Sequence, residues 1–227
     1  MRPAMIDRGK GPLTDIYQRL RAEFGDRQWW PGDSAEEVVI GAILTQSVSW
    51  KNVEVAISRL KEKDLLSLQA INQADASDIA PLIKSTRFYN EKARKLKNFA
   101  RWLFANYGGS LDSMFLRELW GLRKELLAVK GLGEETVDSI LLYAGNKNVF
   151  VVDTYTMRIF SRLGLAQKEW HYQDYQGFFM NYVECDLKIY NDYHAQIVGL
   201  GHFYCRKTNP LCEQCPLLEL CNFASLA

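Results

Sequence analysis

The chain has 227 residues, a formal net charge of +1 and a hydrophobic content of 48%, which are ordinary values for a soluble globular protein. No apolar run is long enough to cross a bilayer, and residues 1–12 lack the apolar core of a secretory signal. We therefore expect a cytoplasmic protein without a membrane partner, built as one large domain or two lobes. Because the net charge is small, a polyanionic partner has to be argued from local features.

Helical periodicity runs through nearly the whole chain and predicts an all-α fold. Apolar residues from Leu13 to Phe24 recur at helix spacing. Ser34 has the position of an N-cap, and Glu37 completes a capping box before the segment 38–44, whose apolar character on all sides predicts a central buried helix. Only the segment 148–152 looks strand-like, and it is too short and isolated to imply a sheet. Further helices are expected near residues 50–63, 75–84, 89–106, 114–128, 134–145, 154–163, 172–186 and 190–204.

Four of the five cysteines crowd into one C-terminal segment with the spacing C-x6-C-x2-C-x5-C. In a cytosolic chain this crowding indicates a metal or cluster before disulfides. A structural zinc site usually has two Cys-x2-Cys pairs, and only one is present, whereas iron–sulfur ligation tolerates looser outer spacings. An iron–sulfur cluster is therefore favoured, with zinc as the alternative, and Cys185 is expected to be a small core residue. The four candidate ligands are Cys205, Cys212, Cys215 and Cys221.

A glycine-bearing turn at residues 131–134, with the sequence GLGE, joins two predicted helices. Such a turn can direct backbone N–H groups outward, and the helix dipole behind them favours a bound phosphate. Asp153 follows a buried run and precedes the next helix, so its carboxylate could sit at the mouth of a cleft beside that turn. A lone aspartate in this position is also typical of a plain N-cap.

Together these features resemble the helix-hairpin-helix DNA glycosylases of the endonuclease III superfamily. The resemblance rests on GAILTQSVSW, IKSTRFYNEKARKLKNFA, LLAVKGLGEETVDSILLYA, VVDTYTMRIFSRLG and the cysteine spacing, all in the family's order. It implies a six-helix barrel lobe over residues 27–147, and a lobe formed by residues 1–26 and 148–227 that holds a 4Fe–4S cluster on the segment 205–221. It also implies a monomer, associated with the nucleoid, that binds double-stranded DNA containing a damaged base.

The resemblance further implies that the damaged base is flipped into a pocket between the lobes, because an N-glycosidic bond inside a stacked duplex is inaccessible. Asp153 would be the catalytic carboxylate, which stabilises positive charge developing on the sugar and orients the attacking water. Gln46 matches the glutamine that enters the space left by the extruded base. The resemblance assigns phosphate binding to two places. These are the hairpin, at Gly131, Gly133 and Glu134, and the loop between cluster ligands, at Arg206 and Lys207.

The hairpin position two residues after the second glycine decides between two kinds of glycosylase. Bifunctional members carry a lysine there, which attacks the sugar and forms a Schiff base. This chain has Glu135, which has no amine, and Lys130 lies on the other side of the turn. We therefore predict a monofunctional glycosylase without AP-lyase activity. Glu134 and Glu135 also suit the first turn of a helix, and Glu135 is a candidate for lining the base pocket.

Three tryptophans point to the substrate. Trp29, Trp30 and Trp50 resemble the pocket of the 3-methyladenine glycosylases of this superfamily, and Ala42 replaces the glutamate of the adenine-excising branch. Aromatic faces can select a cationic alkylated purine by stacking and cation–π attraction. The alternative is that these residues are core; of the adjacent pair we expect one at most to face a pocket, and favour Trp29 together with Trp50.

Other interpretations remain open, because the alkylpurine members in this group lack the cysteine cluster and carry a lysine where this chain has Gln196. The protein could instead excise oxidised pyrimidines with lyase activity, or be a non-catalytic module that recognises DNA damage. The basic stretch 92–101 is expected to be a solvated helix face. His194 and His202 are expected to serve local packing or hydrogen bonding near the cluster.

Overall fold

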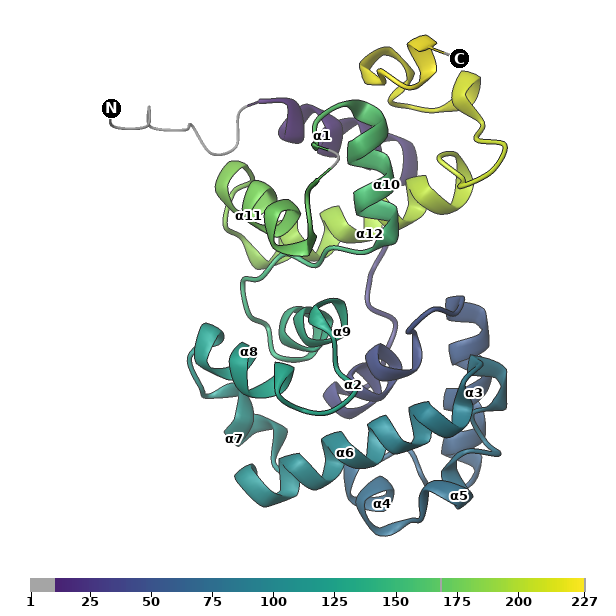
Figure 1. Ribbon diagram of the computed structural model, residues 1–227, viewed down its shortest axis with the longest axis vertical. Coiled ribbons are helices and arrows are strands. Elements are labelled where there is room, and N and C mark those ends of the chain that lie inside the picture. Colours follow the sequence, from purple (N-terminus) through teal and green to yellow (C-terminus); the bar gives the residue numbers. More distant parts are fainter. Residues whose placement is uncertain (1–10, 168, 227) are drawn as a thin grey trace. The chain divides into compact units, whose positions relative to one another are not determined.

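A computed structural model describes residues 11–167 and 169–226; the expectation about a secretory signal falls largely on residues 1–10, outside the described residues. Within the described residues every regular element is a helix and no strand is present, which confirms the all-α prediction (Figure 1). The chain divides into two compact units. We call Pro31–Lys147 the internal unit, and Met1–Trp30 with Asn148–Ala227 the terminal unit.

The internal unit is built around one helix that is buried from its third residue to its end. That helix is α2 (Ala35–Leu44), in which every residue from Glu37 onward is buried, and it contacts α3, α6 and the end of the unit's last helix. The surrounding helices are α3 (Trp50–Glu62), α4 (Leu68–Gln73), α5 (Ala76–Ile79), α6 (Tyr89–Tyr107), α7 (Leu111–Phe115), α8 (Leu119–Leu127) and α9 (Glu134–Ser139), which continues as the π-helical turn η2 (Ile140–Ala144).

Side-chain caps set several of these boundaries. Ser34 Oγ accepts a hydrogen bond of 3.2 Å from the Glu37 amide, as expected for the N-cap of α2. The second half of the expected capping box is wrong, because the Glu37 carboxylate accepts from the amide of Asp33, at 3.4 Å, and pairs with Lys61 at 3.0 Å. Glu118 caps α8 through the amides of Trp120 and Gly121.

Three of the expected helices are wrong in extent, and the one expected over 172–186 ends at Tyr182 as α11 (Tyr172–Tyr182). The helix expected near 75–84 is only the four-residue α5, because Pro81 lacks the N–H needed to continue the ladder. The helix expected near 114–128 is split into α7 and α8, each with its own polar cap. Within 89–106 the expected helix is present as α6, but Lys92 and Lys97 are only 2% and 5% exposed, so the expectation of a wholly solvated basic face is wrong.

The terminal unit joins both ends of the described chain. Its helices are α1 (Pro12–Phe24), α10 (Thr154–Leu163), α11 (Tyr172–Tyr182) and α12 (Leu187–Phe203), followed by three short 3-10 helices. Tyr17 Oη donates to Asp192 Oδ2 at 2.7 Å, and Tyr193 Oη donates to the Leu13 carbonyl at 2.8 Å, which fixes α1 on α12. Cys185 is exposed, so the expectation of a core role for this residue is wrong.

Aromatic side chains form the centre of the terminal unit. The ring of Phe150, in the extended buried segment before α10, stacks on Phe179 of α11 at a centroid distance of 4.0 Å and an interplanar angle of 6°. Tyr190 and Tyr193 of α12 meet the Phe150 ring edge-on. The strand-like composition of this segment thus reflects burial against helices, and it lies directly before Asp153.

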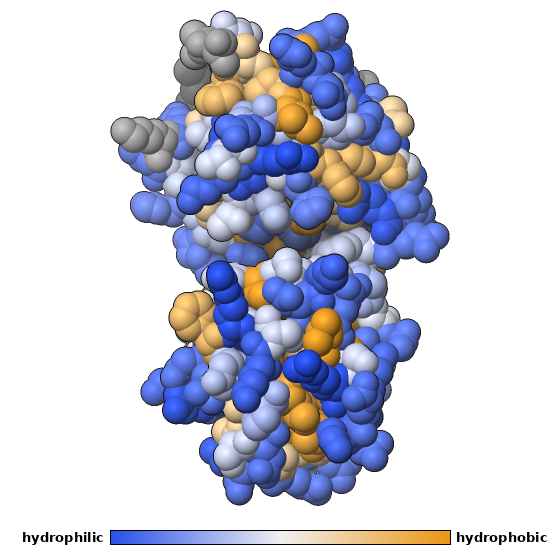
Figure 2. All heavy atoms as spheres, turned by 90° about the vertical axis from the view of Figure 1, so that its right-hand side faces the viewer, coloured by the Kyte–Doolittle hydropathy of each residue, from blue (hydrophilic) through white to orange (hydrophobic). Residues whose placement is uncertain are grey.

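One face of the protein is largely polar. Figure 2 shows hydrophilic residues over most of one face, with smaller hydrophobic groups between them. None of the helices in the described residues combines the length and the apolar run needed to cross a bilayer.

Candidate functional site

The Asp153 carboxylate is held rigidly at the start of α10. Its Oδ1 accepts hydrogen bonds from the Thr156 amide at 2.7 Å and from the Thr156 hydroxyl at 2.8 Å, and the residue is only 8% exposed. The N-cap role is therefore real, but it uses a single carboxylate oxygen. Because Oδ2 takes no part in the cap, capping and catalysis by Asp153 are compatible.

The second carboxylate oxygen faces a histidine from α12. Nε2 of His194 lies 3.7 Å from Oδ2 of Asp153, which is longer than a hydrogen bond. Burial by itself raises the pKa of the Asp153 carboxyl, but His194 and then the Thr156 hydrogen bonds outweigh it and hold the pKa below its usual range. The carboxylate is therefore ionised at neutral pH. From the sequence, His194 is expected to serve local packing or hydrogen bonding near the cluster; its contact with Asp153 depends on tertiary structure.

The glycine hairpin lies between α8 and α9 in the internal unit. Gly131 has a φ of +101°, and a Cβ there would come within 2.5 Å of the Lys95 side chain, so only glycine fits. Gly133 is the N-cap of α9 and its backbone is extended. The two helices are joined by a buried bidentate ion pair, in which Arg123 Nε and Nη2 lie 2.7 and 2.9 Å from the two Asp138 oxygens.

The two hairpin glutamates face different surroundings. Glu134 lies 3.4 Å from Arg123 Nη2 and is half-buried, so its side chain braces the hairpin. Glu135 is exposed on the first turn of α9. Lys130 is exposed just before Gly131, and its carbonyl accepts from the Asn98 side chain at 3.0 Å.

Gln46 lies against the hairpin within the same unit. Its Nε2 donates to the Thr136 hydroxyl at 3.0 Å and to the Gly131 carbonyl at 3.4 Å. Its Oε1 accepts from the Lys95 amine. The side-chain amide of Gln46, the candidate DNA wedge, is thus held against the hairpin, which is the candidate phosphate site.

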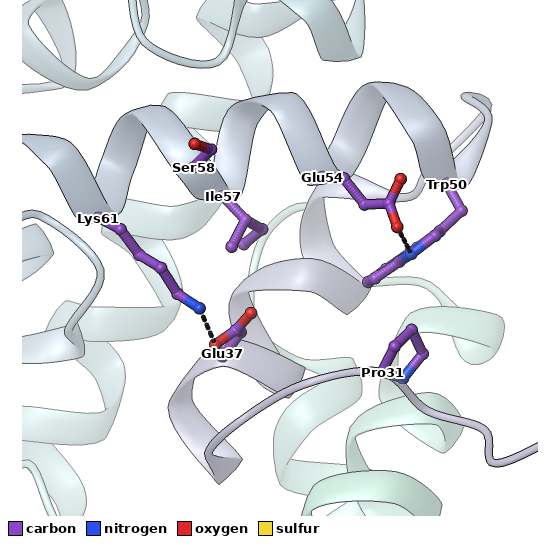
Figure 3. Close-up of a pocket in the computed structure, with 7 residues that line it drawn as sticks. All are labelled: Pro31, Glu37, Trp50, Glu54, Ile57, Ser58 and Lys61. Carbon is purple, nitrogen blue, oxygen red and sulfur yellow. Dashed lines mark hydrogen bonds and ion pairs between the residues drawn. The ribbon is translucent and has the colours of Figure 1, made fainter.

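Trp50 forms one wall of a cavity of about 340 Å³ in the internal unit, a size within the range of small-molecule sites. The indole Nε1 donates to Glu54 Oε1 at 3.0 Å, one turn along α3, and Lys61 reaches from the other end of α3 to Glu37 (Figure 3). Trp29 and Trp30 belong to the terminal unit, where their rings lie 5.3 Å apart at 59° and are half-buried. The cavity is lined by Pro31, Glu37, Trp50, Glu54, Ile57, Ser58 and Lys61.

The four C-terminal cysteines surround one common cavity in the terminal unit. No group of three or more His, Cys, Asp or Glu side chains within residues 11–167 and 169–226 is spaced to hold a single metal ion. Burial, with a smaller contribution from the three other thiols, raises the pKa of the Cys215 thiol to about 11, so four thiolates need a cationic group to hold them together. Four cysteine thiols around one cavity fit the donor set of an iron–sulfur cluster or of a zinc site.

Arg162 of α10 organises the loop that follows Cys205. Its Nη1 lies 3.3 Å from Cys205 Sγ and donates to the Arg206 carbonyl at 2.7 Å, and its Nη2 donates to the Lys207 carbonyl at 3.2 Å. The side chains of Arg206 and Lys207 are exposed. Sequence reasoning missed Arg162, because a basic residue in the last turn of a helix is already explained by the helix dipole.

Comparison with known proteins agrees with these features. The model of the HhH-GPD superfamily of base excision DNA repair proteins matches residues 40–184. A protein of Methanocaldococcus jannaschii, whose name assigns it provisionally to the DNA repair glycosylases, is 44% identical over 210 residues, which cover 92% of this chain and 95% of the relative.

Two solved structures are similar in fold. The H. pylori 3-methyladenine DNA glycosylase bound to 1,N6-ethenoadenine has 25% identity and a TM-score of 0.74, over 84% of this chain and 97% of that one. An endonuclease III in a non-covalent DNA complex has 21% identity and a TM-score of 0.81, over 96% and 98%. The chain belongs to the HhH-GPD superfamily and is a base excision repair DNA glycosylase whose partner is DNA.

Proposed function

We propose that the protein is a monofunctional glycosylase that releases alkylated purines, such as 3-methyladenine, from double-stranded DNA. The observation that carries this proposal is a pair of acids: a buried, ionised carboxylate at Asp153, and an exposed glutamate, Glu135, at the position of the lyase lysine. The first supports hydrolysis of the N-glycosidic bond. The second removes the amine that strand cleavage through a Schiff base would require.

Asp153 acts on charge that develops during the reaction. As the bond between the sugar and the base stretches, positive charge grows on the sugar, and a fixed carboxylate in a dry site stabilises it. Two hydrogen bonds from Thr156 fix Oδ1 in place, so little reorganisation is needed. Water then adds to the sugar carbon that the base has left, and the carboxylate orients it and accepts its proton.

An alkylated purine suits this arrangement because it carries positive charge and leaves without a strong general acid. The cavity beside Trp50 supplies an aromatic wall and two carboxylates, those of Glu37 and Glu54, against the single amine of Lys61. This balance favours a cation, through cation–π attraction and through charge. Similarity to a 3-methyladenine DNA glycosylase structure supports the same substrate class, and we keep Trp29 and Trp30 as proposed contacts of the base.

Binding of the duplex is assigned to two places. The hairpin amides at Gly131, Gly133 and Glu134 would hold one phosphate, and Gln46 would fill the space of the flipped base. Arg206 and Lys207 would contact further phosphates from a loop whose carbonyls are held by Arg162. Cys205, Cys212, Cys215 and Cys221 would hold a 4Fe–4S cluster, whose contribution when bound is a rigid anchor for this loop.

The test is base release from duplexes that contain one defined lesion, for the wild type and for Asp153→Asn. We expect release of 3-methyladenine or 7-methylguanine without strand nicking, loss of release in the variant, and no adduct after borohydride treatment. Release of thymine glycol together with a trapped adduct would instead establish an endonuclease III type of activity. No release from any lesion would favour a non-catalytic damage-binding module.

A further inference from the structure

A second groove in the internal unit, with a volume of about 540 Å³, runs beside α6 and reaches the hairpin. Five of its ten lining residues are basic and two are acidic, a surplus of three positive charges, whereas the whole chain has a net charge of only +1. The groove is thus the local basic patch that composition alone does not reveal. Its residues are Asp75, Ala76, Glu91, Arg94, Lys95, Lys97, Asn98, Arg101, Lys130 and Gly131.

Two of the five basic side chains are committed to the fold. The Lys97 amine donates to the Asn72 carbonyl at 2.8 Å and to the Ala74 carbonyl. The Lys95 amine donates to Gln46. The remaining three, Arg94, Arg101 and Lys130, are exposed.

The acidic residues at the groove do not neutralise these cations. Glu91 pairs with Arg94, but the two side chains are 62% and 61% exposed. An ion pair between groups so exposed contributes little and is readily exchanged. Asp75 is also exposed, and it pairs with none of the three outward cations in the described residues.

The residues that line the groove suit a continuous polyanion better than a free nucleotide or an unpaired base. None of the ten residues is aromatic, so the groove lacks the stacking surface by which proteins hold a free nucleotide or an unpaired base. Arg94 and Arg101 lie seven residues apart on α6, about 10 Å along the helix. That length corresponds to the rise of about three nucleotides of one strand along the axis of a duplex.

The groove also adjoins the hairpin. Gly131 belongs to both, and the Lys130 side chain stands at their junction. We propose that this groove binds the sugar–phosphate backbone of the duplex, continuing from the phosphate assigned to the hairpin, with Arg94, Arg101 and Lys130 as the contacting side chains. The assignment rests on the hairpin phosphate site of the proposed function. Contacts of this kind carry no sequence information and fix the enzyme's register on the duplex.

The test is binding to an undamaged duplex at several salt concentrations, measured for the wild type and for the triple variant Arg94→Gln, Arg101→Gln, Lys130→Gln. Each lost phosphate contact lowers the slope of log affinity against log salt by about 0.9, so we expect a slope smaller by up to about 2.7. The matched control is Arg59→Gln, Lys63→Gln, Lys124→Gln, which removes the same charge from exposed positions on or beside α3 and α8.

Thermal unfolding checks that all three proteins are folded. A control slope equal to that of the wild type, beside a reduced slope in the triple variant, supports the groove. An unchanged slope in the triple variant, or an equal reduction in both, overturns it. Undamaged DNA offers no base to excise, so this result does not depend on lesion specificity; an unchanged slope with intact release of alkylated bases would refute the groove alone.

Discussion

The Nε2 of His194 lies 3.7 Å from one oxygen of Asp153, while the other oxygen caps α10 through Thr156. One carboxylate therefore serves two elements of the terminal unit, α10 and α12. The cap orients it, and the histidine favours its ionised form. Substitutions at these residues separate the capping of α10 from the stabilisation of the ionised carboxylate.

Asp153→Asn and Asp153→Ala are expected to differ in stability but not in activity. Asparagine is as good an N-cap as aspartate, whereas alanine costs about 1 kcal/mol of unfolding free energy. Both variants lack the carboxylate, so single-turnover base release should fall by about 10²- to 10⁴-fold. Urea unfolding and release of 3-methyladenine measure the two effects. Retained release in the asparagine variant would remove Asp153 from the mechanism.

The stability of the wild type should depend on Asp153 in acid. Because the pKa of this carboxyl is lower in the folded state, its ionised form stabilises the fold above the unfolded pKa of about 3.9. That contribution is lost as pH falls through the lower folded-state pKa. The difference in unfolding free energy between wild type and Asp153→Asn should be constant from pH 7 to about 5 and decline below about 4. A difference that does not change with pH contradicts the shift.

His194→Gln should alter the pH profile of base release. The imidazole is a positioning residue that lowers the pKa of Asp153; with glutamine the pKa of Asp153 rises. The acidic limb of the single-turnover rate should then move to higher pH, with little change at pH 8. His202→Gln, an exposed position at the end of α12, is the control. A uniform loss at every pH would indicate a packing role only.

Glu135→Lys should introduce a trappable intermediate. An amine at this position on the first turn of α9 can attack the sugar and form an imine, so borohydride should give a protein–DNA adduct that the wild type does not form. Glu134→Lys is the adjacent control, because residue 134 faces Arg123. Equal trapping by both variants would mean that the position is not selective.

The Arg123–Asp138 pair should be the electrostatic anchor of the hairpin. Both side chains are buried, so Asp138→Ala leaves a guanidinium without its bidentate partner and should cost about 3–5 kcal/mol of unfolding free energy. Asp112→Ala, at an exposed position on α7, should cost far less. Urea unfolding of both variants tests this, and similar small losses would show that the pair contributes little.

The sequence predicts those parts of the fold that local signals determine. Ser34 and the all-apolar segment after it identified α2, and the hairpin glycines and the cysteine spacing placed their segments. Pro81 and Glu118 mark the end of α5 and the start of α8, but the apolar periodicity extends past both residues. These errors concern how far an apolar pattern extends, not which class of element forms.

Contacts between residues far apart along the chain leave no local pattern in the sequence. The contact between His194 and Asp153 depends on how α12 packs against α10. The burial of Lys92 and Lys97 could not be inferred from a basic stretch, because each amine is satisfied by backbone carbonyls from distant segments. The hydrogen bonds of Arg162 to the loop after Cys205 are of the same kind.

The pairing of α1 with α12 also sets an order of events during synthesis. Tyr17 is synthesised well before its hydrogen-bond partner Asp192, which follows 175 residues later along the chain. At ordinary translation rates this interval lasts roughly ten to thirty seconds. Meanwhile Pro31–Lys147 can leave the ribosome and fold. During that interval α12 is not available to cover the apolar face of α1, which carries Leu13, Ile16 and Leu20. Chaperones or transient contacts within the chain must shield this face until α12 is made.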